Sequence, residues 1–239
     1  MVKLVNFTAG LGFAALLLAA ACATNPPLSP EESAQGQARL SAISRLPDCA
    51  SAQTITADRT AHIPDCRLKA GPSGLHLVVT SDPVEFEMLG PSGFVSVSVT
   101  NRRGQSIGDF AEITHGLYAY PEVHDANGDG LQDVVIPRSV DGMNVTYSLW
   151  LQQKDGDFAH AGEVSGSQMS WASGGMVTAA QRVGVSDWTV GYYSIGEAGK
   201  LQEVALVKGA GSQPPKRGGR CEVVRIAKGA KPGRFCSTR

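Results

Sequence analysis

The chain has 239 residues, of which 42% are hydrophobic, 6% aromatic and 18% charged, and its formal net charge is −1 at pH 7. This length suffices for a buried core, and the supply of Val, Ile and Leu excludes wholesale disorder. The charge is unevenly distributed. Residues 208–239 carry nine Lys or Arg and one acid, Glu222, whereas residues 1–207 carry 12 basic and 21 acidic residues. An acidic body with a net charge of −9 therefore precedes a basic tail.

The N-terminus has the pattern of an export signal. Lys3 precedes an apolar run over residues 7–21 that ends in small residues, as signal peptides do. The segment LAAAC resembles a bacterial lipobox with Ala19 in place of the usual Leu. In that case Cys22 carries the lipid, and Ala23 after it favours the outer membrane; cleavage at an A-x-A site by general signal peptidase is the alternative. We expect a signal peptide over 1–21 and a periplasmic protein anchored through Cys22.

The cysteine count supports the lipid anchor. Five cysteines are an odd number for an exported chain, and lipidation of Cys22 leaves four. These four fall into two pairs with similar local spacing, in an oxidising compartment that permits disulfides: Cys49 with Cys66, and Cys221 with Cys236. Crossed pairing of the same cysteines, or free buried thiols, are the alternatives.

A Pro-rich tether and a short helix follow the signal. Residues 22–30 contain three prolines and no periodicity, which suits a spacer. Ser29, Pro30 and Glu32 then form a helix start with a capping box, and Pro47 ends the helix after about residue 45. We assign residues 31–74 to this helix and a disulfide loop.

The chain has the pattern of β-structure from about residue 75. Residues 94–99 (FVSVSV) alternate strictly between apolar and hydroxyl side chains, and residues 134–136 form a fully apolar run typical of a central strand. We expect further strands over 75–79, 83–89, 147–151, 189–195 and 201–207, with hairpin turns at 155–157 and 196–199. The sequence therefore predicts a mainly β fold, an antiparallel β-sandwich or barrel-like domain over 75–210 with a short N-terminal helix, followed by a basic, disulfide-closed tail over 211–239.

Residues 125–133 (DANGDGLQD) carry the most specific motif. Calcium prefers six to eight oxygen ligands, and a tight loop supplies them from alternate residues. Gly130 fits the sharp turn, and Ile136 stands where an EF-hand needs a bidentate Glu. We therefore predict a Ca²⁺ loop on a β-scaffold, the alternative being an Asx-rich turn without metal. The predicted ligands are Asp125, Asn127, Asp129 and Asp133 with the backbone carbonyl of Leu131.

The same segment resembles a known family. The run HDANGDGLQDVVIP is similar to the calcium loops of FG-GAP and VCBS-type repeats. Together with residues 144–151, residues 155–158, Tyr193 and the segment at Lys200, it resembles single-motif periplasmic lipoproteins related to periplasmic lysozyme inhibitors and to immunity proteins of bacterial type IV secretion killing systems. The resemblance spans roughly residues 85–208. It implies a calcium-binding periplasmic β-domain and inhibition of a peptidoglycan hydrolase as one role.

No catalytic motif accompanies these features. The sequence contains no Gly-x-Ser-x-Gly elbow, Ser-x-x-Lys motif, P-loop or zinc-binding histidine spacing, and His124 beside the acidic loop is expected to be a surface imidazole. Our first hypothesis is a non-enzymatic, calcium-binding envelope lipoprotein that presents its β-domain to a protein partner, an inhibitor or immunity protein against a peptidoglycan hydrolase being one form. The alternative is a structural lipoprotein that binds cell-wall glycan through the basic tail. A hydrolase is a third hypothesis, and nothing indicates nucleic-acid binding.

Overall fold

A computed structural model describes residues 27–52, 64–69, 71, 73–86, 90–115, 120–172 and 175–237. The predicted signal peptide and Cys22 lie outside the described residues. In the part of the chain that is described, no helix has the length and apolar content needed to span a membrane.

The strands of the described residues form three antiparallel sheets and a small parallel pair. The first sheet, sheet A, has the order β1-β2-β3-β4: β1 (Cys66–Leu68), β2 (His76–Phe86), β3 (Gly90–Thr100) and β4 (Ser106–His115). Sheet B has the order β5-β6-β7-β8: β5 (Glu122–His124), β6 (Asp133–Asp141), β7 (Asn144–Gln152) and β8 (Phe158–Gly166).

Sheet C follows in the chain, with the order β14-β12-β11-β10-β9. Its strands are β9 (Gln168–Ala172), β10 (Met176–Arg182), β11 (Asp187–Ile195), β12 (Leu201–Ala210) and β14 (Glu222–Ile226). The C-terminal segment adds the parallel pair β13 (Gly219–Arg220) and β15 (Cys236–Ser237), with the 3₁₀ helix η1 (Pro232–Arg234) just before β15.

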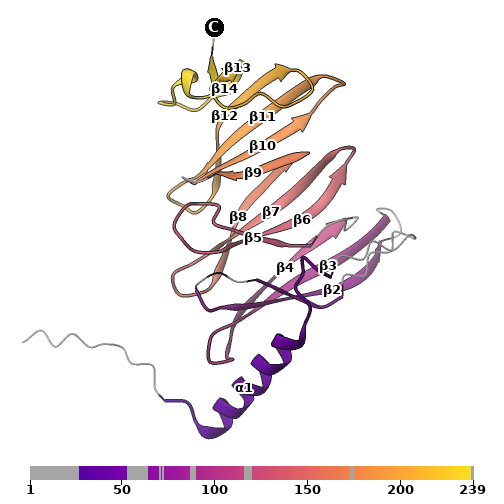
Figure 1. The fold of residues 1–239 in the computed structure, drawn as a ribbon, viewed down its shortest axis with the longest axis vertical. Coiled ribbons are helices and arrows are strands. Elements are labelled where there is room, and N and C mark those ends of the chain that lie inside the picture. Colours follow the sequence, from indigo (N-terminus) through magenta and orange to yellow (C-terminus); the bar gives the residue numbers. More distant parts are fainter. Residues whose placement is uncertain are drawn as a thin grey trace, which may run out of the picture.

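The sheets stack face to face, with sheet B between the other two (Figure 1). One apolar cluster joins sheets A and B, a second joins sheets B and C, and a third joins sheet C to the C-terminal segment. The described strands stack rather than close into a barrel, so the mainly β, sandwich-like fold predicted from the sequence is confirmed.

The alternation of side chains explains this stacking. In β3, Val95, Val97 and Val99 are at most 1% exposed and face sheet B, while Ser98 points to solvent. In β6, Val134 and Ile136 face sheet A while Val135 faces sheet C. Because successive strand residues point to opposite faces, a run of apolar residues in β6 is what a sheet covered on both sides requires, and the prediction of a central strand is confirmed.

The helix prediction is also confirmed. Helix α1 (Pro30–Arg45) begins after Ser29, whose hydroxyl accepts a hydrogen bond from the backbone N–H of Glu32, and the Glu32 carboxylate accepts one from the backbone N–H of Ser29. The latter bond lowers the pKa of Glu32, and the Ser29 hydroxyl adds to the effect. The helix contacts the β3–β4 turn, where Arg39 donates to the carbonyl of Gly104 at 2.7 Å.

Several strands differ from the predictions. The separate strands expected at 75–79 and 83–89 are one strand, β2, and Pro83 lies within it. Among the described residues, β1 pairs only with Leu77–Val79, so Pro83 lies where β2 has no described neighbour on that side, a position at which a strand tolerates proline. Strands β4, β8, β9 and β10 were not expected from the sequence.

The cysteines form the two local disulfides, Cys49–Cys66 and Cys221–Cys236, with Cα separations of 4.9 Å and 5.2 Å. Cys49 and Cys66 are buried in the cluster between sheets A and B. Cys236 is buried where the C-terminal segment covers sheet C. Local pairing is therefore confirmed, and crossed pairing is excluded.

Candidate functional site

The predicted calcium loop connects β5 to β6 at one end of sheet B. Gly128 and Gly130 adopt φ angles of +77° and +84°, which L side chains rarely adopt. These two positive φ values fold residues 125–132 into a tight turn, as the sequence predicted for Gly130.

Within this loop, three of the predicted ligands hold the backbone. The Asp125 carboxylate accepts from the backbone N–H groups of Gly128 (2.8 Å) and Gly130 (3.1 Å). The Asn127 side chain accepts from the backbone N–H of Asp129 and donates to its carboxylate, which also accepts from the N–H of Leu131. The structure thus brings Asp125, Asn127 and Asp129 into one compact loop of nested Asx turns.

Asp133, unlike these three residues, is the first residue of β6 and is buried. It is fully buried, and its carboxylate accepts from the backbone N–H groups of Ala126 (2.8 Å) and Gln152 (3.0 Å). Burial raises the pKa of Asp133 to about 6 despite these hydrogen bonds, which lower it. Asp133 therefore ties the start of the loop to the end of β7.

The donor chemistry of the loop suits a hard cation, because carboxylate and amide oxygens alternate along it. In the described residues, however, no group of three or more Asp, Glu, His or Cys side chains is placed to hold a metal ion. The side-chain oxygens of the loop accept hydrogen bonds from backbone amides and, for one oxygen of Asp129, from the Asn127 side chain. Calcium binding by the predicted ligands stays a prediction. These ligands are the Asp125, Asn127, Asp129 and Asp133 side chains and the Leu131 carbonyl.

His124, next to the loop, has other partners. Its Nε2 lies 2.8 Å from the Glu122 carboxylate, and its ring stacks on Trp171 with 5.1 Å between centroids. The hydrogen bond with His124 lowers the pKa of Glu122. This agrees with the expected surface imidazole beside a carboxylate.

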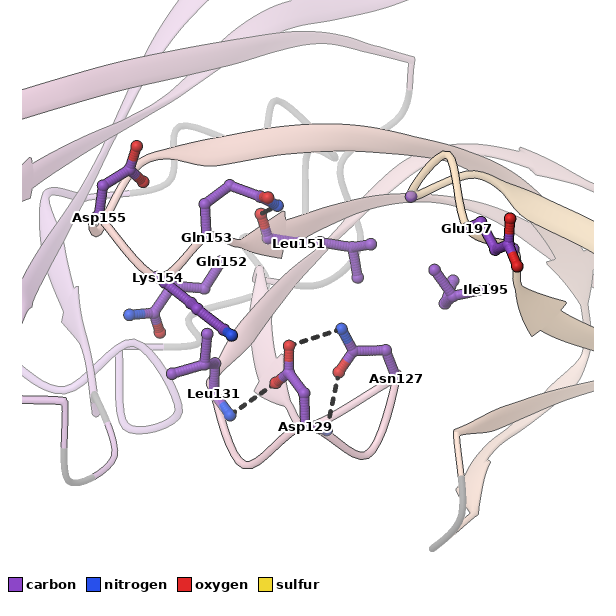
Figure 2. Close-up of a pocket in the computed structure, with 12 residues that line it drawn as sticks. Asn127, Asp129, Leu131, Leu151, Gln152, Gln153, Lys154, Asp155, Ile195 and Glu197 are labelled. Atoms are coloured by element: carbon purple, nitrogen blue, oxygen red, sulfur yellow. Dashed lines mark hydrogen bonds between the residues drawn. The ribbon is translucent and has the colours of Figure 1, made fainter. Parts of the chain in front are cut away.

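An open cleft of about 540 Å³ lies beside the loop. Three connections form it: the β5–β6 loop, the β7–β8 turn and the β11–β12 turn (Figure 2). In an antiparallel meander, alternate connections share one end of the sheet. Neighbouring sheets B and C therefore gather these three loops side by side.

Each of the three loops contributes a carboxylate to the cleft. Asp129 comes from the β5–β6 loop, Asp155 from the β7–β8 turn and Glu197 from the β11–β12 turn, and Lys154 is the single cation in the described lining. In Figure 2 the Lys154 side chain extends toward Asp129, while Asp155 and Glu197 lie on opposite sides of the cleft. The sequence indicated 155–157 and 196–199 only as turns, because nothing local shows that they meet the calcium-like loop.

A second polar cluster joins sheets A and B. Glu112 of β4 accepts hydrogen bonds from Ser148 (2.5 Å) and Trp150 (2.8 Å) of β7 and forms an ion pair with Arg138 of β6. His160 Nε2 lies 3.9 Å from the same carboxylate. The Ser148 hydroxyl donates to Glu112 and not to His160, so these residues do not form a Ser–His pair. The hydrogen bonds and the ion pair of Glu112 connect sheet A to sheet B.

No protein-family model matches the chain, including those for FG-GAP and VCBS repeats, and no curated protein matches it. Among solved structures, the chain is similar to PliI-Ah, the periplasmic lysozyme inhibitor of I-type lysozyme from Aeromonas hydrophyla. The identity is 18% and the TM-score 0.34, with 43% of this chain and 87% of that chain covered. The proposals below therefore start from the chain's own residues.

Proposed function

We propose that the chain is a non-enzymatic envelope protein that binds a protein partner through the cleft between its β5–β6, β7–β8 and β11–β12 connections. Its specific form is an inhibitor or immunity protein against a peptidoglycan hydrolase. The observation that carries the proposal is the convergence of three loops from two sheets, each with a carboxylate, on one open cleft. Binding residues are commonly carried by loops on a rigid scaffold.

The charge of the cleft indicates which part of a partner it accepts. The described lining of the cleft contains three carboxylates and one cation, Lys154. The carboxylates are those of Asp129, Asp155 and Glu197. An acidic cleft of this kind attracts Lys and Arg side chains and speeds the encounter with a basic surface. A basic loop of a hydrolase therefore fits the cleft better than an acidic one.

The envelope location is supported by two independent features. The N-terminal segment has the composition of a signal peptide with a lipobox-like end at Cys22. The structure contains two disulfides, which persist in oxidising compartments. We place the protein in the periplasm, anchored to the outer membrane through lipid on Cys22.

Calcium is a separate part of the proposal. The ion would be held by the ligands predicted from the sequence, which are Asp125, Asn127, Asp129, Asp133 and the Leu131 carbonyl. The side-chain oxygens of the first three already lie in one loop. Bound there, it would neutralise loop carboxylates and stiffen one wall of the cleft. The contacts with the partner would be made by the residues that line the cleft and not by the ion.

Inhibition of purified lysozyme-type hydrolases, followed as the clearing of a peptidoglycan suspension, tests this function. We expect inhibition by the wild type, and a half-inhibitory concentration raised about threefold to tenfold when Asp155→Asn and Glu197→Gln are combined, since two exposed ion pairs are lost. The matched control combines Asp109→Asn and Asp141→Asn, two exposed acids that do not line the cleft. Equal inhibition by both double variants, or none by the wild type, would overturn the proposal.

A further inference from the structure

The C-terminal segment forms a basic cap on the last sheet of the stack. The basic cap, residues 211–237, contains β13, β14, η1 and β15 and is closed by the Cys221–Cys236 disulfide. It lies at the end of the molecule opposite helix α1 (Figure 1). It is therefore the part of the described chain most distant from helix α1.

The inner side of the basic cap is apolar. Phe235 is fully buried, and its ring lies 5.0 Å from that of Tyr192 on sheet C. Cys236 is buried in the same cluster, and Val223 and Ile226 of β14 pack against it. Because this side covers sheet C, the exposed residues of the cap lie on its outer side and edges.

The exposed side chains of the basic cap are dominated by cations. Arg225 is paired with Glu203 through two hydrogen bonds of 2.9 Å and 3.0 Å, and Glu222 is paired with Lys208. Within residues 211–237, six further cations are exposed and have no carboxylate partner in the described chain: Lys216, Arg217, Arg220, Lys228, Lys231 and Arg234. The only acid of the cap, Glu222, is thus already neutralised.

This arrangement presents uncompensated positive charge on a chain whose residues 1–207 have a net charge of −9. Each ion pair between an exposed cation and a carboxylate contributes little binding energy by itself. A polymer with many carboxylates can form several such ion pairs with the cap at once, and their contributions combine. The disulfide and the apolar inner side hold the charges on a fixed surface instead of a free tail. Both features favour a repetitive anionic partner over a single small ligand.

We propose that the basic cap binds the carboxylate-bearing peptidoglycan of the cell wall. Since α1 and the cap lie at opposite ends of the molecule (Figure 1), the lipid anchor proposed above would direct the cap away from the anchoring membrane and toward the wall polymer. The inference rests on two parts of the proposed function, the envelope location and the lipid anchor on Cys22. It uses none of the cleft residues, so either can fail without the other.

Sedimentation of the mature chain with purified sacculi tests this proposal. Wild-type protein should pellet with sacculi, and less of it should pellet as salt is raised. Combining Lys228→Gln, Lys231→Gln and Arg234→Gln should weaken binding about fivefold to tenfold. The matched control combines Arg45→Gln, Lys69→Gln and Arg103→Gln, three exposed cations outside the cap, and should bind as the wild type does.

Two results would overturn the proposal. One is equal binding to sacculi by the cap variant and the control variant. The other comes from the same sedimentation assay with vesicles that contain phosphatidylglycerol. If the cap variant loses binding to these vesicles but binds sacculi as the wild type does, the partner is anionic lipid. Circular dichroism of both variants checks that the fold is intact, and an unchanged half-inhibitory concentration for the cap variant shows that the cleft is unaffected.

Discussion

Replacing Asp133 with Ala should loosen the attachment of the cleft to sheet B. The buried Asp133 carboxylate accepts from the backbone N–H groups of Ala126 and Gln152, one at the β5–β6 loop and one at the end of β7. In Asp133→Ala both donors lose their acceptor inside the protein. An unsatisfied buried donor costs about 1–3 kcal/mol, so with two such donors we expect the free energy of unfolding to fall by about 2–6 kcal/mol at pH 5.

The effect of Asp133→Ala should depend on pH. Because burial raises the pKa of Asp133 to about 6 from its ordinary value of 3.8, the folded state holds a proton between these values that the unfolded state releases. The stability that Asp133 contributes therefore decreases as pH rises from about 4 to 6. The shift corresponds to at most about 3 kcal/mol, so the variant should lose less stability at pH 7.5 than at pH 5.

Urea denaturation in chelator at both pH values measures these effects. Asp109→Ala, at an exposed position, is the control and should change the free energy of unfolding by less than about 0.5 kcal/mol. If Asp133→Ala destabilises the protein no more than Asp109→Ala at pH 5, the proposed role of Asp133 is wrong. A loss that grows with pH would contradict the assigned cause of the pKa shift.

Three further predictions concern the metal, the anchor and the thiols. Calcium should raise the melting temperature of the wild type, and Asp125→Ala or Asp129→Ala should abolish the rise because each removes a predicted oxygen ligand; an unchanged rise in both variants counts against the site. Radiolabelled palmitate should label the native protein but not Cys22→Ser, and equal labelling would refute the lipid anchor. Mass spectrometry without reduction should find no free thiol in the mature protein, because four cysteines are paired and we propose that lipid blocks Cys22; alkylation of four cysteines would contradict this.

Local patterns in the sequence predicted the elements that local interactions determine. The capping box of Ser29 and Glu32 set the start of α1, and the Val–Ser alternation of β3 set its buried face. Strands β8 and β9 escaped prediction because their segments, FAHAGEVSG and QMSWA, contain few large apolar residues and no regular alternation. Their conformation depends on pairing with β7 and β10, which only the folded sheets provide.

In the candidate site too, the sequence predicted what local interactions determine and missed what depends on the stacking of the sheets. Residues 125–133 were predicted as one tight loop before a strand; the structure has this loop over residues 125–132, because their own Asx and Gly residues form the turn, and Asp133 begins β6. Asp155 and Glu197 were expected only in hairpin turns, since their meeting with Asp129 depends on how sheets B and C stack. Asp133 was grouped with the loop ligands, yet its burial follows from the first position of β6, which the spacing alone does not show.

Hydrogen–deuterium exchange of the chain with and without an inhibited hydrolase tests the central claim most directly. The account predicts slower exchange on binding in the β5–β6 loop, the β7–β8 turn and the β11–β12 turn, the three connections that line the cleft. Exchange in the β6–β7 hairpin around Gly142, which does not line it, should stay unchanged. Slowing confined to that hairpin, with the three cleft loops unaffected, would contradict the account.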